Sequence, residues 1–96
     1  MELFIFARFH AGEHQEQGVA ALLRDMLGPV RAESSCVTIG AFRSTRDPRL
    51  FFVHSPWIDE PALDLHASLP HTVEFIKRVQ PPIDHELEAT RTQPVE

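Results

Sequence analysis

The order of strand-like and helix-like segments in these 96 residues predicts an α+β fold with the sequence β-α-β-β-α-β. Three observations support this. Phe-rich apolar runs stand at the start and in the middle of the chain, two segments carry helical apolar spacing, and a short turn joins the central runs. This order corresponds to a split-βαβ, or ferredoxin-like, arrangement, in which helices cover one face of a four-stranded antiparallel sheet.

The first apolar run, residues 2–10, stops at Ala11-Gly12, which predicts a strand followed by a turn. Strand alternation puts apolar side chains on both faces of the sheet: Leu3, Ile5, Ala7 and Phe9 on one face, and Phe4 and Phe6 on the other. A strand that is apolar on both sides needs cover on each. Helices cover one face, and an exposed apolar sheet face marks an interface, so we expect a homodimer with its sheets face to face.

The middle of the chain predicts a helix and then a hairpin. Residues 13–33 carry one apolar stripe at helical spacing, formed by Val19, Leu22, Leu23, Met26, Leu27 and Val30. Gly28-Pro29 is expected to kink or shorten this helix, because proline lacks the N–H that a helix interior needs. Residues 36–45 and 50–57 have strand character, and the turn residues 46–49 between them predict an antiparallel hairpin.

The last third of the chain predicts a second helical region and a final strand. Asp59 is a suitable N-cap, and Pro61 fits the first turn, where the missing N–H costs little. Pro70 should break or kink this helix, and Thr72 is expected to cap its continuation. Residues 85–92 predict the last strand.

Length and composition restrict the class of protein. One domain over residues 1–92, with a frayed tail at 93–96, is what a chain of this size can form. The net charge of −5 and the lack of a basic stripe disfavour nucleic-acid binding. Cys36 is the only cysteine, so no intramolecular disulfide can form. The apolar runs are too short for a signal peptide or a membrane span, and we expect a cytoplasmic protein.

Several segments resemble a known family. The strand ELFIFARFH, the hairpin FRSTRDPRLFFVHSPW and the segment DEPALDLHASLPHTVEF resemble the antibiotic biosynthesis monooxygenase superfamily of dimeric α+β barrels. The most specific part is Trp57 at a strand end, Asp59-Glu60 at a helix start, then His66, His71 and Phe75. The resemblance covers nearly the whole chain.

The resemblance implies a function class as well as a fold. Superfamily members include polyketide and quinol oxygenases that use molecular oxygen without metal or flavin, and also haem-degrading enzymes. It implies a substrate pocket between the sheet and the helices of each protomer. This chain departs from those relatives because it contains no Asn and no Tyr. The polyketide oxygenases and the haem degraders both place an Asn near the pocket, beside a Trp, and the polyketide oxygenases also use a Tyr. Of that set, only Trp57 can be carried over.

His66 is the candidate catalytic residue. A neutral imidazole in an apolar pocket can deprotonate a phenolic or enolic substrate, giving an electron-rich anion that reduces oxygen. The alternative is a helix histidine that only satisfies a backbone carbonyl. Trp57 and Phe75 are candidate pocket walls, although a lone tryptophan at a strand end is also a common core residue.

His71 and Arg8 are the candidate polar contacts to substrate. His71 follows the expected helix break, a place suited to a pocket mouth, although the position favours an exposed loop histidine or a helix cap. Arg8 shares its strand face with Phe4, Phe6 and His10. Its side chain either clamps an anionic or quinone oxygen or pairs with Glu86 or Glu88 on the last strand.

The sequence favours no metal site and no cofactor. The six histidines are scattered, none lies in a recognised metal-binding spacing, and transition-metal sites usually draw three or more protein ligands. Strand alternation also separates His54 from Trp57, which argues against a pair formed by His54 and His66. Haem or metal binding is therefore only a third possibility.

The leading hypothesis is a cofactor-independent monooxygenase that oxidises a small aromatic or quinol-like molecule with molecular oxygen. The alternative is a non-enzymatic dimeric protein of the same fold that binds a small ligand or serves in a stress response. Because analogy of fold is a weak argument for activity, the geometry of the site has to distinguish these two hypotheses.

Overall fold

The computed structural model describes residues 2–96, so Met1, where the expected domain begins, lies outside the described residues. The elements are β1 (Leu3–His10), α1 (Glu16–Arg31), β2 (Gly40–Arg43), β3 (Leu50–Trp57), α2 (Glu60–Ser68), α3 (Pro70–Val79) and β4 (Glu88–Thr92). The expected β-α-β-β-α-β order is confirmed, with the second helical region divided into α2 and α3. No helix among the described residues is long and apolar enough to cross a membrane.

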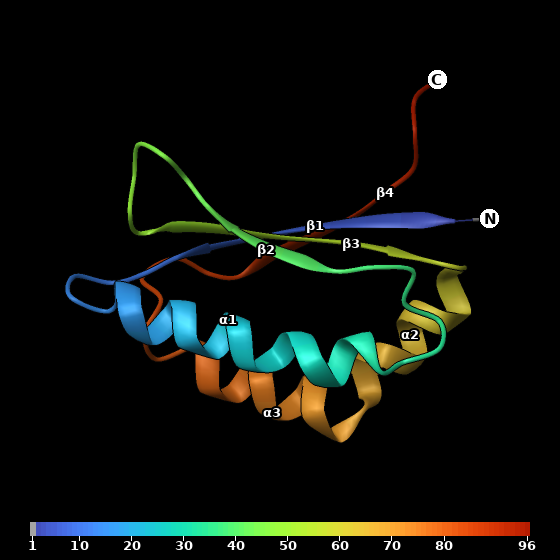
Figure 1. Cartoon of the computed structure of the whole chain (residues 1–96), viewed down its shortest axis with the longest axis horizontal. Helices are drawn as coiled ribbons and strands as arrows, with labels where there is room; N and C mark the ends of the chain where they lie inside the picture. Colours follow the sequence, from blue (N-terminus) through green and yellow to red (C-terminus); the bar gives the residue numbers. More distant parts are fainter. Residues whose placement is uncertain (1) are drawn as a thin grey trace.

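The four strands form one antiparallel sheet in the order β2-β3-β1-β4, and all three helices lie on one side of it (Figure 1). The central pair β1 and β3 runs in full register, from Leu3 opposite Trp57 to His10 opposite Leu50. This register puts the tryptophan at one end of the sheet and His10 at the other. The sheet and helix layers enclose the hydrophobic core.

The core is built from the two periodic patterns seen in the sequence. Alternate residues of β1 and β3 are buried against the helices, and α1 buries Val19, Leu23 and Val30 of its predicted stripe. The other stripe members, Leu22, Met26 and Leu27, are partly buried against the same cluster. Apolar burial of this kind is the main stabilising contribution to a domain of this size.

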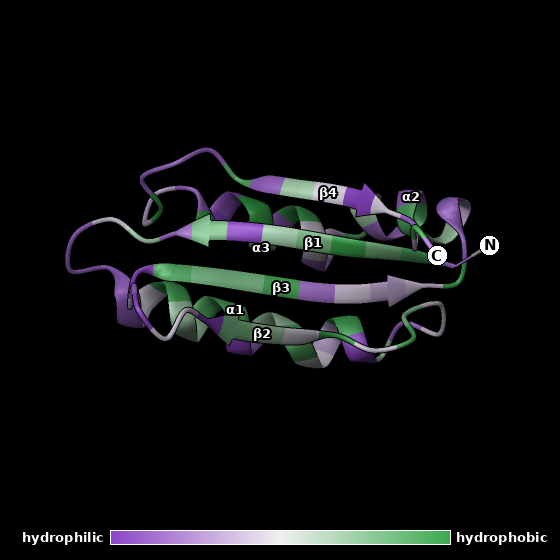
Figure 2. Cartoon of the chain, turned by 90° about the horizontal axis from the view of Figure 1, so that it is seen from above, coloured by the Kyte–Doolittle hydropathy of each residue, from purple (hydrophilic) through white to green (hydrophobic). Residues whose placement is uncertain are grey.

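The face of the sheet away from the helices is apolar and uncovered in the monomer. Figure 2 looks onto this face, and no helix lies in front of the strands there. Phe6 is 52% exposed and Phe42 is 57% exposed, and the strand register puts both on this face. His54 packs here as well, with its ring centroid 4.8 Å from that of Phe6. The expectation that His54 and Trp57 project from opposite faces is confirmed, because Trp57 is buried on the helix side.

The ends of the elements differ from expectation in three places. Helix α1 spans Glu16–Arg31 and is thus shorter than residues 13–33, but it continues two residues past Pro29, because only the last turn follows the proline and few hydrogen bonds are lost there. Strand β2 is shorter than residues 36–45, with Cys36 joined to Trp57 only by an isolated bridge. Strand β4 likewise starts at Glu88 rather than at residue 85.

Of the two N-caps predicted in the last third of the chain, one is confirmed and the other is wrong. Asp59 is the N-cap of α2, and its side chain accepts a hydrogen bond from the Ala62 N–H at 2.9 Å. Thr72 does not cap α3. Leu69 is the N-cap instead, because Pro70 occupies the first helical position, where no N–H is needed.

Candidate active site

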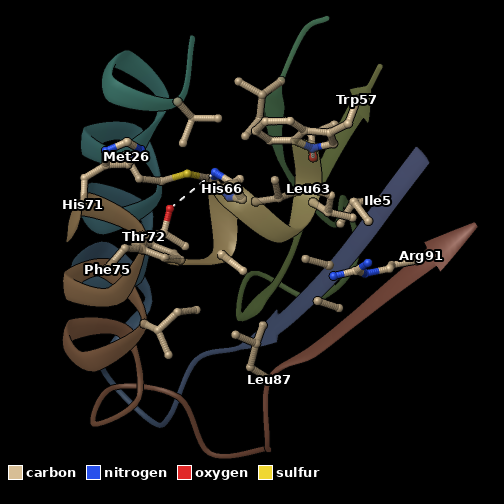
Figure 3. A pocket seen from close by; sticks show the side chains of 18 of the residues that line it. Ile5, Met26, Trp57, Leu63, His66, His71, Thr72, Phe75, Leu87 and Arg91 are labelled. Atoms are coloured by element: carbon tan, nitrogen blue, oxygen red, sulfur yellow. Dashed lines mark hydrogen bonds between the residues drawn. The ribbon is translucent and has the colours of Figure 1, made fainter. Parts of the chain in front are cut away.

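A cavity of about 360 Å³ lies between the inner face of the sheet and the three helices (Figure 3). Its walls are mainly apolar and include Ile5, Met26, Leu63, Phe75 and Leu87. The polar side chains that reach it are Ser55, His66, His71, Thr72 and Arg91. A cavity of this size, largely apolar with few polar groups, is typical of a small-molecule site.

Trp57 forms the wall at the end of β3. It is 1% exposed, and its Nε1–H donates a hydrogen bond to Ser55 Oγ at 2.9 Å. Both residues point inward because they are two apart on a strand. Since Ser55 satisfies the indole N–H, Trp57 offers the cavity an aromatic surface rather than a hydrogen-bond donor.

His66 and His71 share one carboxylate, that of Glu33. Glu33 Oε2 lies 2.8 Å from His66 Nδ1 and 2.8 Å from His71 Nε2. The carboxylate side chain is only 13% exposed, and that of His66 is 18% exposed. An ionised carboxylate can only accept, so both ring nitrogens donate to it. In their neutral forms this leaves His66 Nε2 and His71 Nδ1 as the unprotonated nitrogens.

A helix break brings the two histidines together. In an unbroken helix, residues five apart point in directions about 140° apart. Here α2 ends at Ser68 and α3 begins at Pro70, so His66 and His71 belong to different helices. The turn after α1 supplies the partner, with the Glu33 N–H bonded to the Val30 carbonyl at 3.0 Å. Three separate segments therefore meet at one carboxylate oxygen.

The surroundings of His66 orient its ring further. Thr72 Oγ1 lies 3.3 Å from His66 Nδ1, at the first turn of α3 (Figure 3). The indole of Trp57 lies against the imidazole, with ring centroids 4.4 Å apart and planes inclined by 37°. The ion pairs of Glu33 recorded within residues 2–96 are both with histidine. The hydrogen bond to the carboxylate holds the His66 ring in one tautomer.

A comparison with protein-family models matches the antibiotic biosynthesis monooxygenase model over residues 3–78. The chain belongs to the antibiotic biosynthesis monooxygenase family. Several solved structures share its fold. A search of curated protein sequences found no match.

Three solved structures illustrate the likeness of this family member. Rv0793 from Mycobacterium tuberculosis superposes with a TM-score of 0.93 at 23% identity, covering 100% of this chain and 97% of that one. PA3566 from Pseudomonas aeruginosa gives 0.88 at 22% identity, covering 99% and 95%. SnoaB, described as a cofactor-independent oxygenase from Streptomyces nogalater, gives 0.87 at 10% identity, covering 99% and 94%. At these identities the likeness shows the fold alone.

Four of the five site residues expected from the sequence of this antibiotic biosynthesis monooxygenase family member line the cavity: Trp57, His66, His71 and Phe75. Phe75 also packs edge-on against Phe9, with centroids 6.0 Å apart. Arg8 differs. It is exposed on the outer face of the sheet, opposite Glu88 in the strand register, and does not line this cavity. Strand alternation explains this, because the inner face of β1 carries the odd-numbered residues.

Sequence reasoning missed Glu33 and Arg91. Glu33 follows a helix end and looks like a solvated charge until the fold brings two histidines to it. Arg91, on β4, reaches the cavity but donates hydrogen bonds to Asp64 Oδ1 at 2.7 Å and Glu60 Oε2 at 3.2 Å. The hydrogen bond to Asp64 is the main cause that raises the pKa of Arg91. Its guanidinium thus ties the last strand to α2.

A second cluster lies at the opposite end of the sheet. His10 Nδ1 is 2.6 Å from Asp84 Oδ1, its Nε2 is 3.2 Å from Asp47 Oδ2, and Arg49 donates to Asp84 Oδ2 at 2.8 Å. The hydrogen bond to Asp84, followed by that to Asp47, raises the pKa of His10. Hydrogen bonds from His10 and His85 lower the pKa of Asp84. This cluster links the ends of β1, the β2–β3 turn and the segment before β4.

Proposed function

We propose that this protein is a monooxygenase that oxidises a small aromatic or quinol-like molecule with molecular oxygen and needs no bound cofactor. Membership of the family supports the reaction class. The observation that carries the proposal is that His66, which lines a mainly apolar cavity, is held by the Glu33 carboxylate. The cavity suits an aromatic substrate, and the pair provides an oriented base where that substrate would bind.

In the proposed reaction the substrate ring packs against Trp57 and Phe75. The unprotonated Nε2 of His66 takes a phenolic or enolic proton, and the Glu33 carboxylate stabilises the imidazolium that forms. The neighbouring indole face also favours that cation. The substrate anion then donates electrons to molecular oxygen. One oxygen atom enters the product and the other leaves as water, so the substrate supplies all four electrons and no external reductant is required.

The test is aerobic oxidation of a naphthohydroquinone or an anthrone, followed with an oxygen electrode in chelator-treated buffer. Removing a general base lowers turnover by about 10²–10⁴-fold, and we expect that loss in His66→Ala. His85→Ala is the matched control, because His85 is exposed at the far end of the sheet. Unchanged turnover in folded His66→Ala would remove this residue from the mechanism.

We also propose that the protein is a homodimer that pairs through the outer face of the sheet. The exposed phenylalanines there, Phe6, Phe42 and Phe52, form an apolar surface on three neighbouring strands. A second copy with the same surface covers it, and such apolar patches are typical of interfaces. The cavity lies on the other side of the sheet, so each protomer keeps its own site.

One observation favours a second candidate function. The chain has neither Asn nor Tyr, so a substrate oxygen would find few neutral hydrogen-bond donors in the cavity. A dimeric protein that binds a small apolar ligand without oxidising it would use the same walls. Quenching of Trp57 fluorescence by the same hydroquinones, without oxygen uptake, would favour this candidate over the oxygenase.

A further inference from the structure

We propose that Glu33, His66 and His71 form a binding site for one divalent transition-metal ion of the Zn²⁺ class. The ligand atoms of these three side chains all lie within 4.8 Å of one another. Two imidazole nitrogens and one carboxylate oxygen are a ligand set that Zn²⁺ accepts in proteins. The sequence offers no sign of this site, because 33 residues separate Glu33 from His66.

The present geometry lies close to that of a bound ion. Glu33 Oε2 is 2.8 Å from each imidazole nitrogen. Two ligand atoms bound to the same tetrahedral Zn²⁺ at 2.0–2.1 Å stand about 3.3 Å apart. An ion therefore needs each imidazole nitrogen to stand about half an ångström farther from the carboxylate oxygen, and the two nitrogens, which lie within 4.8 Å of each other, to take the same spacing of about 3.3 Å. Metal entry replaces two N–H···O hydrogen bonds, and each neutral ring moves its proton to the other nitrogen.

The surroundings favour this site over the other cluster of histidines and carboxylates in residues 2–96. That second cluster, His10, Asp84 and His85, holds the cation Arg49 within 2.8 Å of the Asp84 carboxylate. The ion pairs recorded for Glu33 involve no lysine or arginine, and its carboxylate is better shielded from water. A dication meets less electrostatic repulsion and less competition from water at Glu33.

The three protein ligands leave a fourth coordination position free. Sites with three protein ligands usually hold a water molecule there, next to an open cavity. His66 and His71 both line the cavity, so that position has room for water. Thr72 Oγ1, at 3.3 Å from His66 Nδ1, is placed to hydrogen-bond such a water.

Metal binding would also switch off the proposed oxidation, a consequence that rests on the proposed function. An ion on Nδ1 of His66 forces the remaining ring proton onto Nε2, where the proposed base needs its lone pair. The same residues then serve as a metal site or as a base, but not as both at once. Zn²⁺ is thus an inhibitor of the metal-free enzyme.

The test is titration of the whole chain with Co²⁺, read by visible absorption, and with Zn²⁺, read by calorimetry. We expect one ion per chain and the intense bands of tetrahedral Co²⁺. Loss of a group that only supports a ligand weakens metal binding by about 10–100-fold. Changing a ligand itself should cost at least the upper end of that range, and we expect this for Glu33→Gln and His71→Ala. His85→Ala, which alters only the second cluster, should bind as the unaltered protein does.

Two outcomes would overturn the metal site: no stoichiometric binding to the unaltered protein, or binding that His85→Ala removes and Glu33→Gln does not. Circular dichroism establishes that each variant is folded. The Co²⁺ spectrum needs no substrate, so the metal site can be verified even in a protein that oxidises nothing. Conversely, oxygen uptake without any Co²⁺ binding would remove this inference and leave the proposed function intact.

Discussion

Glu33 Oε2 lies 2.8 Å from Nδ1 of His66, although the two residues are 33 positions apart in the chain. The contact joins the turn after α1 to the last turn of α2, and it adjoins the cavity that lies under the sheet. A partly buried carboxylate that receives an imidazole N–H both selects the tautomer and stabilises the protonated ring. This pair is therefore the centre of the proposed chemistry and of the proposed metal site.

Glu33→Gln should lower the turnover number of the proposed oxidation by about 10–100-fold with little change in KM. The amide keeps the size of the side chain and its acceptor oxygen, but it lacks the charge that stabilises the imidazolium. The measurement is oxygen uptake in chelator-treated buffer. Glu13→Gln, at an exposed position, is the control. Equal turnover in Glu33→Gln and the control would show that the carboxylate does not assist His66.

Ser55→Ala should destabilise the folded state by about 1–3 kcal/mol, because it leaves the buried indole N–H of Trp57 without an acceptor. The free energy of unfolding can be measured by urea denaturation. Ser68→Ala, whose hydroxyl is exposed, should change it by less than about 0.5 kcal/mol. Equal effects of the two substitutions would mean that the indole N–H finds another acceptor.

The His10 cluster should make stability depend on pH. Contacts to Asp84 and Asp47 raise the pKa of His10 in the folded state. The stabilisation from protonated His10 is therefore complete below the pKa of histidine in the unfolded chain, about 6.5, and is lost as pH rises through the raised pKa of the folded state. The Tm difference between the unaltered protein and His10→Ala should thus be larger at about pH 5.5 than at about pH 9. A difference that stays constant over this range would contradict the assignment.

Acid should act on the same cluster through Asp84. The hydrogen bonds from His10 and His85 lower the pKa of Asp84 in the folded state. The stabilisation from ionised Asp84 is therefore complete above the usual aspartate pKa of about 3.9, and it is lost as pH falls through the lowered pKa of the folded state. Asp84→Asn should therefore lower Tm at neutral pH and have a smaller effect under strongly acidic conditions. Thermal scans of the two proteins across acidic pH provide the measurement.

Phe6→Asp combined with Phe52→Asp should dissociate the proposed homodimer. Phe6 and Phe52 project from adjacent strands β1 and β3 on the outer face, and paired protomers would bring the added charges close together in a dry interface. Sedimentation velocity distinguishes monomer from dimer. Leu65→Asp, at an exposed position on α2, is the control and should leave the mass unchanged. An unaltered protein that sediments as a monomer would refute the dimer.

Much of the local structure could be predicted because it depends on short-range patterns. The alternation in β1 and β3, the apolar stripe of α1 and the Asp59 N-cap are all found as expected. The ends of elements were less predictable. Thr72 resembles a cap, but Pro70 begins α3 two residues earlier, and Thr72 instead lies against His66.

The residues of the candidate site also divide into those that could be predicted from the sequence and those that could not. Trp57, His66, His71 and Phe75 could be placed near one cavity, because the family resemblance and the strand-to-helix order put them there. Arg8 could not be placed correctly without knowing which face of β1 meets the helices.

The sequence by itself determined the order of elements, the apolar face of each and the family, since these follow from side-chain periodicity and local motifs. Only the tertiary structure decided that Glu33 is the shared partner of His66 and His71. The physical reason is that this contact depends on how α1 ends, how sharply the chain turns at Pro70, and how closely α1 packs on α3. No local pattern encodes those three relations together.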